Sequence, residues 1–280
     1  MAGIDASLPD VTTAQGRTGL AALRAAPERS VVALDFDGTL APIVPDPDQA
    51  RPHPDVLPVL SRLAPRLRAL AVVTGRPAEL AVRYGGFAGA PGLENLTVLG
   101  AYGAERWDAA TGRLTAPPPD PGVLAARDEL PALLRELAAP GGVRVEDKGL
   151  AVAVHTRQAP DPAGAFASLR TPLTALAERH ALQLEPGRFV LELRPHGMDK
   201  GRALTALLTE LDAGPVLYAG DDLGDLAAFD AVDRRRADGP PGLLVCSGSA
   251  EVTALTDRAD VVVDGPPGVA AFLAALDDAG

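Results

Sequence analysis

A short apolar run that ends in two carboxylates is the feature that most restricts the fold of this chain. Residues Val31–Leu34 predict a buried strand, because four consecutive apolar residues bounded by polar ones are typical of a sheet interior. Asp35 and Asp37 follow directly, and alternate residues of an extended segment share one face. Gly38 permits a tight turn, and Thr39 places a hydroxyl just after it. We therefore expect two carboxylates at the carboxyl edge of a parallel sheet, which is where ligands bind in such folds.

The same arrangement of an apolar run followed by polar residues recurs along the chain. Leu70–Val73 leads into Thr74-Gly75-Arg76-Pro77, and Val216–Ala219 leads into Gly220-Asp221-Asp222. Short strands that alternate with helical patterns predict an α/β fold with a doubly wound parallel sheet. The other predicted strands of this sheet are Leu96–Leu99, Leu243–Val245 and Val261–Val263.

The pattern changes between residues 116 and 195. A proline-rich linker is followed by two helix–hairpin pairs, with hairpins predicted over Val143–His155 and Leu182–Arg194. This order predicts a small α+β domain with an antiparallel sheet. The expected organisation is a loose tail over residues 1–16, a doubly wound core over residues 17–115 and 196–280, and an inserted cap over residues 116–195.

The sequence also predicts three helices and one loop in the rest of the chain. A first helix is expected over Thr18–Ala26, and a helix from Val56 should end or kink at Pro65. A helix over Phe166–Leu182 is expected to be interrupted near Pro172. Residues Gly100–Trp107 predict a loop that faces a substrate, with a plain turn as the alternative.

Charge and composition argue against several classes of protein. A net charge of −11 argues against a nucleic-acid-binding surface, which needs a basic face. Residues Met1–Asp10 show no secretory signal, and no apolar stretch approaches the ~20 residues of a membrane helix. Cys246 is the only cysteine, so no internal disulfide is possible and a reducing compartment is favoured. We expect a cytoplasmic protein whose partner is a small molecule rather than a nucleic acid or a membrane.

Lysine is rare in this chain. Of 26 basic residues only two, Lys148 and Lys200, are lysines. A sequence so rich in arginine is expected to keep lysine where a compact ammonium does what a planar guanidinium cannot. Chance retention of two surface lysines is the alternative.

The acids at the strand ends predict a site for phosphoryl chemistry. Asp35, Asp37 and Asp221 offer oxygen ligands for Mg²⁺, and the absence of His and Cys from these motifs argues against zinc. Asp35 can attack phosphorus to give an aspartyl-phosphate, while Asp37 can protonate the leaving oxygen and then activate water. Thr74 and Lys200 would hold the phosphoryl oxygens.

Two further acids have an ordinary explanation beside a supporting role in the site. Asp222 can cap the helix that follows the strand, with Asp225 in its first turn. Asp221, at the end of the strand itself, is not explained in this way.

Taken together, these motifs resemble those of the haloacid dehalogenase superfamily of phosphatases. Asp37 is similar to the second aspartate of the phosphatase branch, and a cap inserted between the second and third motifs is typical of that branch. The motifs, in chain order, are Asp35-Phe36-Asp37-Gly38-Thr39, Thr74-Gly75-Arg76, Lys200, and Gly220-Asp221-Asp222 with Asp225.

Within that superfamily the chain resembles the trehalose-6-phosphate phosphatase family. The resemblance rests on Asp35–Ile43, Gly103–Arg106, Lys148–Arg157, and Glu192–Pro195 leading to Lys200-Gly201. It implies Mg²⁺-dependent hydrolysis of trehalose 6-phosphate to trehalose and phosphate, the last step of trehalose biosynthesis. It also implies functional coupling to a trehalose-6-phosphate synthase, and we expect a monomer.

The resemblance further implies a set of substrate contacts. Lys148, Glu192 and Arg194 of the cap would contact the sugar hydroxyls, with Glu105 nearby, although a solvated hairpin charge is the alternative for each. Contacts from the core would come from Gly75, Arg76 and Tyr102.

Departures from the family pattern are found at two positions. Tyr102 stands where the family usually has histidine, and Gly224 stands where threonine is common. His155 has a family counterpart, but a lone histidine in a strand is more often structural. Two other functions stay open, namely a phosphatase for sucrose phosphate or a glycosyl phosphoglycerate, and a catalytically idle domain that binds a sugar phosphate.

Overall fold

The computed structural model describes residues 9–44, 46–248 and 253–278. The chain forms two compact units, one made of Met1–Thr115 with Asp199–Gly280 and the other of Ala116–Met198. Each unit has its own hydrophobic core and is described by itself. No helix in the described ranges is long and apolar enough to cross a lipid bilayer.

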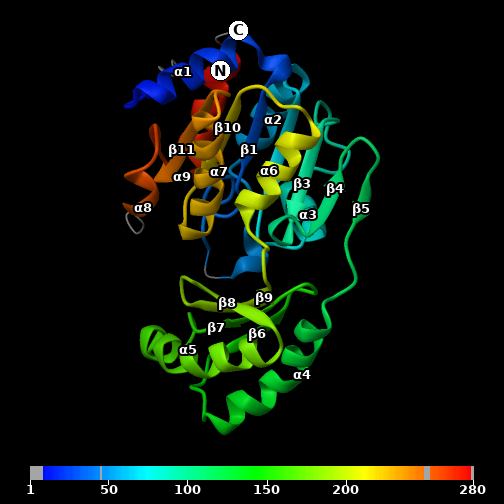
Figure 1. The fold of residues 1–280 in the computed structure, drawn as a ribbon, viewed down its shortest axis with the longest axis vertical. Coiled ribbons are helices and arrows are strands. Elements are labelled where there is room, and N and C mark those ends of the chain that lie inside the picture. The colour runs from blue at the N-terminus through cyan, green and yellow to red at the C-terminus, as the bar shows by residue number, and fades with distance from the viewer. Residues whose placement is uncertain (1–8, 45, 249–252, 279–280) are drawn as a thin grey trace. The chain divides into compact units, whose positions relative to one another are not determined.

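The first unit is built on an eight-stranded sheet of order β12-β11-β10-β1-β2-β3-β4-β5 (Figure 1). The strands from β12 to β3 pair in parallel, which confirms the predicted α/β fold. Every residue of β1, β2, β3 and β10 is buried, as expected for strands covered on both faces. The parallel strands are β1 (Val31–Leu34), β2 (Ala69–Val73), β3 (Leu96–Gly100), β10 (Val216–Gly220), β11 (Gly242–Gly248) and β12 (Val261–Asp264).

The remaining two strands were not predicted. β4 (Glu105–Asp108) and β5 (Arg113–Thr115) extend the sheet antiparallel to β3, so the expected loop over Gly100–Trp107 is wrong in its second half. All three residues of β5 are exposed, and β4 buries only Trp107. Neither strand therefore carries the apolar signal on which the prediction of a strand depends.

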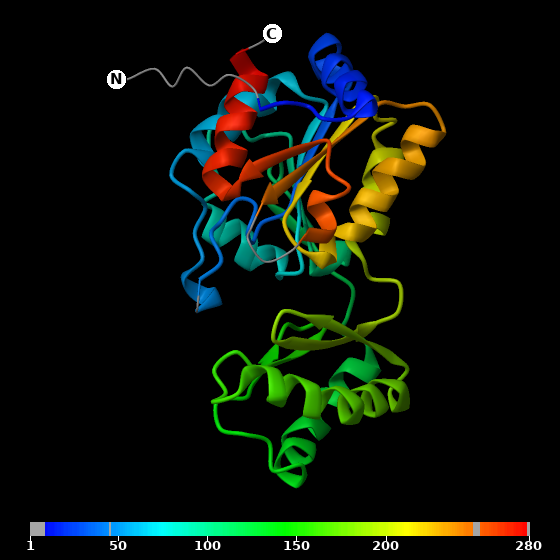
Figure 2. The ribbon, with the colours of Figure 1, turned by 90° about the vertical axis from the view of Figure 1, so that its left-hand side faces the viewer.

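Helices cover both faces of this sheet. Figure 2 shows α9 on one side and α7 on the other. The core on the first side also receives α1, α2 and α3, whereas the core on the second side receives α6 and α8. The helices are α1 (Ala14–Ala25), α2 (Val56–Leu63), α3 (Ala78–Gly85), α6 (Lys200–Glu210), α7 (Leu226–Ala237), α8 (Thr253–Thr256) and α9 (Gly265–Asp278), with short 3-10 helices η1 (Pro27–Arg29), η2 (Pro47–Gln49), η3 (Ala64–Arg66), η4 (Ala101–Gly103) and η5 (Leu223–Asp225).

Two predictions about the first unit have clear outcomes. The predicted stop at Pro65 is confirmed, because α2 ends at Leu63 and continues only as a 3-10 turn. The prediction of a loose tail is wrong over its last residues, because α1 begins at Ala14. The Thr13 hydroxyl caps this helix by accepting a hydrogen bond from the Gly16 amide at 2.9 Å. Residues 1–8 lie outside the described residues.

The second unit is an antiparallel sheet of order β6-β7-β9-β8 with two helices. Leucines of both helices pack against Val152, Val154, Leu191 and Leu193, so strand alternation directs Glu192 and Arg194 to the opposite face. The elements are α4 (Pro121–Glu136), β6 (Arg144–Asp147), β7 (Val152–His155), α5 (Pro162–Arg179), β8 (Leu182–Gly187) and β9 (Val190–Pro195).

The predicted interruption near Pro172 is wrong, because α5 runs through this proline without a break. Leu169, Leu173 and Leu176 bury one stripe of the helix in the core. Most helical stability in proteins comes from such a packed face, and here it offsets the hydrogen bond that proline removes.

Candidate active site

Two neighbouring parallel strands bring the first acids together. Asp35 follows β1 and Asp221 follows β10, and these strands pair so that Leu34 lies opposite Ala219. The Asp35 amide continues this ladder by donating to the Ala219 carbonyl oxygen at 2.9 Å. Both carboxylates therefore start from the carboxyl edge of the sheet, and both residues are buried.

A buried lysine lies against Asp35. Lys200 is the first residue of α6, whose start is fixed by Asp199, as predicted, since the Asp199 side chain accepts from the Arg202 amide at 2.8 Å. The Lys200 Nζ atom lies 2.7 Å from Asp35 Oδ1 and 2.8 Å from Asp225 Oδ1. Lys200 is only 4% exposed, so the ammonium is held almost out of water by two carboxylates.

Burial and charge act against each other on this pair. Burial alone would lower the pKa of Lys200, but the carboxylates of Asp225 and Asp35 outweigh it and raise this pKa well above its usual value. Burial raises the pKa of Asp35, and the Lys200 ammonium opposes that effect. Lys200 therefore favours a positive charge next to the Asp35 carboxyl group.

Asp225 holds this arrangement in place. Its Oδ1 atom accepts from Lys200 and from the Tyr218 hydroxyl at 2.6 Å, and its Oδ2 atom accepts from the amides of Asp221 and Asp222 at 3.0 and 3.2 Å. Sequence reasoning missed Tyr218, a single polar ring in an otherwise apolar strand. Because both oxygens of Asp225 are engaged, this residue orients the site.

The predicted capping by Asp222 is confirmed. Its side chain accepts from the Gly224 amide at 2.8 Å and forms a capping box with Asp225.

Asp35 and Asp221 form the part of the cluster that fits a cation. Asp35, Asp221 and Asp225 each offer an oxygen within 4.8 Å of the others. Burial, followed by the charge of Asp35, raises the pKa of Asp221 to about 10. Within the described part of the chain no group donates a hydrogen bond to the buried Asp221 Oδ1 atom, and an oxygen of this kind is suited to a hard metal ion.

The turn after β1 leaves no room for a side chain beside Asp221. A Cβ atom built on Gly38 would lie 2.0 Å from Asp221 Oδ2, and Gly38 has a φ of +77°. The Ser247 hydroxyl donates to the Gly38 carbonyl at 2.6 Å and fixes the turn from β11. Sequence reasoning missed Ser247, because a serine near a strand end has no distinctive spacing.

Asp37 is engaged by an arginine. Arg76 donates through Nε to Asp37 Oδ2 and through Nη2 to Asp37 Oδ1, both at 2.6 Å. The predicted metal set of Asp35, Asp37 and Asp221 therefore differs from the cluster in the structure, where the third carboxylate is that of Asp225. The reason is that a planar guanidinium binds both oxygens of a carboxylate at once.

Thr74, Gly75 and Tyr102 lie together after β2. The Thr74 hydroxyl accepts from the Arg76 amide at 3.2 Å, and the Thr74 carbonyl accepts from the Tyr102 amide at 2.9 Å. A Cβ atom on Gly75 would lie 2.7 Å from the Tyr102 ring, so this glycine allows the ring to pack closely.

Glu105 has a structural partner. Its Oε2 atom accepts from the Ala78 amide at 2.5 Å, at the start of α3. Burial raises the pKa of Glu105, and this backbone hydrogen bond opposes the effect. The carboxylate therefore stabilises the beginning of a helix in this structure.

The candidate sugar-contacting residues of the second unit meet on one sheet. Lys148 Nζ lies 2.5 Å from Glu192 Oε2, and Arg194 Nη2 lies 2.9 Å from Glu185 Oε2. The Arg194 and Glu192 side chains are 6% and 4% exposed, so they are not solvated hairpin charges. His155 pairs with Glu146 at 2.7 Å on the same sheet.

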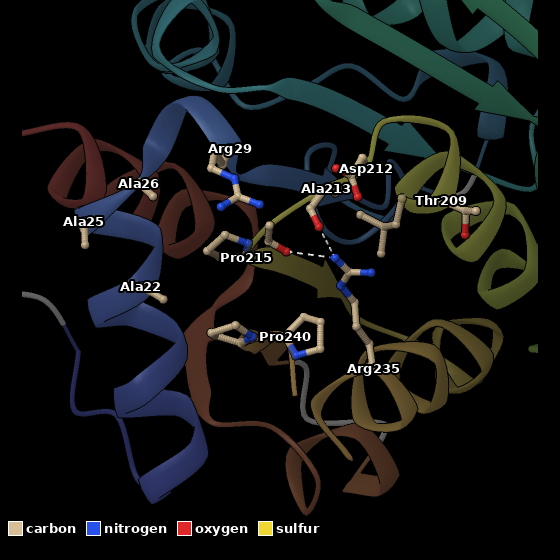
Figure 3. A pocket seen from close by; sticks show the side chains of 13 residues that line it. Ala22, Ala25, Ala26, Arg29, Thr209, Asp212, Ala213, Pro215, Arg235 and Pro240 are labelled. Atoms are coloured by element: carbon tan, nitrogen blue, oxygen red, sulfur yellow. Dashed lines mark hydrogen bonds between the residues drawn. The ribbon is translucent and has the colours of Figure 1, made fainter. Parts of the chain in front are cut away.

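A separate pocket of about 690 Å³ lies at the end of the large sheet opposite the carboxyl ends of its parallel strands. Figure 3 shows Arg29, Pro215 and Pro240 around it. Arg29, Pro215 and Pro241 come just before β1, β10 and β11, so this pocket is at the amino ends of the strands. Arg235 closes the adjacent turn by donating to the carbonyls of Ala213 and Gly214. None of the predicted site residues lines it.

Comparison with known proteins gives a consistent result. A family model described as trehalose-phosphatase matches residues 33–261. The trehalose-phosphate phosphatase of Mycobacterium tuberculosis H37Rv is 35% identical over 279 residues, which cover 95% of this chain and 64% of that protein. The trehalose-6-phosphate phosphatase of Escherichia coli K12 is 35% identical over 209 residues, which cover 72% and 73% of the two chains. This chain therefore spans under two thirds of the length of its mycobacterial relatives.

Solved structures share the fold. The C-terminal domain of Candida albicans trehalose-6-phosphate phosphatase matches with a TM-score of 0.75 at 21% identity, covering 98% of this chain and 99% of that one. A trehalose-6-phosphate phosphatase related protein matches with a TM-score of 0.69 at 24% identity, covering 89% and 97%. At these identities the likeness concerns the fold alone.

Proposed function

The chain belongs to the trehalose-phosphatase family, and from this we propose that it hydrolyses trehalose 6-phosphate to trehalose and phosphate. One observation carries the proposal, which is that the buried Asp35 carboxylate lies 2.7 Å from a buried ammonium and beside Asp221. A nucleophile, a positive charge and a cation site are the parts that phosphoryl transfer to a carboxylate requires.

The reaction has two half-reactions. In the first, an Asp35 oxygen bonds to phosphorus while the bond from phosphorus to the sugar oxygen breaks, and Asp37 gives that oxygen a proton. In the second, Asp37 takes a proton from water, the water oxygen bonds to phosphorus, and the bond to Asp35 breaks. Lys200 and Thr74 bind phosphoryl oxygens as negative charge develops on them.

We propose Mg²⁺ as the cation, held by Asp35 and Asp221. When bound, it would screen the repulsion between the Asp35 carboxylate and the phosphate. Support comes from the all-oxygen donor set and from the buried Asp221 oxygen, which accepts no hydrogen bond from any residue that the structure describes. Asp225 is excluded from this role because its oxygens already accept four hydrogen bonds.

We propose that the second unit is the cap that recognises the sugar, through Lys148, Glu192 and Arg194. Glu192 and Arg194 are buried and Lys148 is half-buried, their charges are paired, and such groups penalise a ligand that leaves them unpaired. Contacts of Tyr102 and Glu105 with the substrate remain predictions, as do the cytoplasmic location, the monomeric state and the coupling to a synthase.

A substrate panel tests the proposed activity. We expect phosphate release from trehalose 6-phosphate in the presence of Mg²⁺, at a rate about 10²-fold above that for sucrose phosphate or a glycosyl phosphoglycerate, because mismatched hydroxyls leave buried groups unpaired. Colorimetric assay of phosphate measures each rate. Equal rates on all three substrates contradict the choice of trehalose, and no release from any of them supports the idle domain.

Mg²⁺ should stabilise the protein through Asp221. At a Mg²⁺ concentration 100 times its Kd we expect the free energy of unfolding to rise by about 2.7 kcal/mol, since the ion binds the folded state. Asp221→Asn should abolish the rise, whereas Asp222→Asn should keep it, because Asp222 is exposed and accepts from Gly224. Thermal unfolding with and without Mg²⁺ measures both effects, and a full rise in Asp221→Asn contradicts the assignment.

A further inference from the structure

Arg76 forms a two-point ion pair with Asp37, the residue to which we assign proton transfer. Two of the three guanidinium nitrogens bind the two oxygens of one carboxylate, each at 2.6 Å. The Arg76 side chain is 13% exposed and that of Asp37 is 32% exposed. Such a two-point contact fixes the plane of the carboxylate as well as its position.

Aromatic rings hold Arg76 itself in place. Its Cζ atom lies 5.6 Å from the ring centre of Phe36 and 5.5 Å from that of Tyr84, within the range of cation–π attraction. Both rings are buried, and the Tyr84 hydroxyl donates to Asp48 at 3.0 Å. The guanidinium is therefore positioned before any substrate arrives.

The chain reaches this pair through two motifs. Asp37 lies in the turn after β1, and Arg76 lies between β2 and α3. The two residues come together because β1 and β2 are neighbours in the sheet. The Arg76 backbone is fixed as well, because its amide donates to the Thr74 hydroxyl and its carbonyl accepts from the Ala101 amide. Both ends of the arginine are thus anchored to the sheet edge that carries Asp35.

We propose that Arg76 is a positioning residue, which aims the Asp37 carboxyl group at the reacting oxygen and does not act by binding the phosphoryl group. This inference rests on the proposed function, because it assigns Asp37 the proton transfers of that reaction. Its consequence is that the loss of Arg76 should harm only steps that need a proton from Asp37.

The leaving group separates this role from phosphate binding. A sugar alcohol or phenol leaves poorly without a proton, whereas dinitrophenol leaves well as its anion. We expect Arg76→Lys to lower kcat/KM about 10²-fold for trehalose 6-phosphate and for phenyl phosphate, the lower range of general acid catalysis, but less than about tenfold for dinitrophenyl phosphate. The ratio kcat/KM is used because it reports only the first half-reaction.

A double-mutant cycle gives an independent readout. In an Asp37→Asn background, Arg76→Lys should cause less than about threefold further loss, because the two residues act as one unit. Arg83→Lys is the matched control, since Arg83 also lies over the Tyr84 ring, at 5.0 Å, but is exposed and has no contact with Asp37 among the described residues. Thermal unfolding of each variant monitors the fold.

Equal losses on good and poor leaving groups, or a full loss of about 10²-fold in the Asp37→Asn background, would show that Arg76 binds the phosphoryl group and overturn the proposal. Failure of the proposed function gives a different result. In that case the parent hydrolyses aryl phosphates but not trehalose 6-phosphate, and the comparison of phenyl with dinitrophenyl phosphate still tests Arg76.

Discussion

Asp35→Asn is expected to reduce turnover of trehalose 6-phosphate by at least about 10⁴-fold, because it removes the proposed nucleophile. The fold should survive the change. Lys200 keeps its contact with Asp225 at 2.8 Å, and Asp221 loses a like-charged neighbour that raises its pKa. We therefore expect the midpoint of thermal unfolding to stay within about 3 °C of the parent.

Two measurements make this result specific. Acid quenching with labelled substrate should trap phosphate covalently on the parent and not on Asp35→Asn. Asp55→Asn is the control, since the same change at a side chain that is 65% exposed should leave turnover within about twofold. If Asp35→Asn retains more than about 1% of parental turnover, the carboxylate is not the nucleophile.

Of the variants proposed here, Lys200→Met is expected to lower the free energy of unfolding most. The change keeps an unbranched side chain, one heavy atom shorter, but leaves Asp35 and Asp225 without the ammonium that lies 2.7 and 2.8 Å from them. Removing one partner from a buried ionic cluster costs about 3–5 kcal/mol of unfolding free energy. Turnover should fall as well, since we propose that Lys200 stabilises the charge that develops on the phosphoryl group.

The chain provides a matched control in its other lysine. Lys148→Met should cost less than Lys200→Met, because the Lys148 side chain is 16% exposed and Glu192 retains Arg194 at 3.8 Å. Asp225→Asn should recover part of the stability lost in Lys200→Met, since it removes a buried carboxylate that has become unpaired. Denaturant unfolding measures these differences, and equal losses for the two lysine variants contradict the assigned burial of Lys200.

The positions of the parallel strands could be predicted because a strand buried on both faces appears in the sequence as a run of consecutive apolar residues. Val31–Leu34, Leu70–Val73 and Val216–Ala219 are continuous apolar runs, and each becomes a strand of the large sheet. The turn that follows each run is local too, so the sequence predicted which acids start from the carboxyl edge. Chain order alone also separated the inserted hairpins from the parallel core.

Edge strands and helical prolines could not be predicted for a related reason. β5 is wholly exposed, so its pairing with β4 leaves no apolar pattern in the sequence. Pro172 lies within α5 because Leu169 and Leu173 pack into a core formed by residues distant in the chain. The rule that proline interrupts a helix considers only neighbouring residues, so it does not account for packing against distant ones.

The amino-acid sequence by itself determined the fold class, the trehalose-phosphatase family, the identity of the acids at the strand ends and that of the lysine at the start of α6. Only the tertiary structure decided how those charges are paired, with Lys200 between Asp35 and Asp225, and with Asp37 bound by Arg76. The physical reason is distance. Residue type and local spacing follow from neighbours in the chain, whereas the partner of a buried charge is set by which strand ends the sheet places side by side.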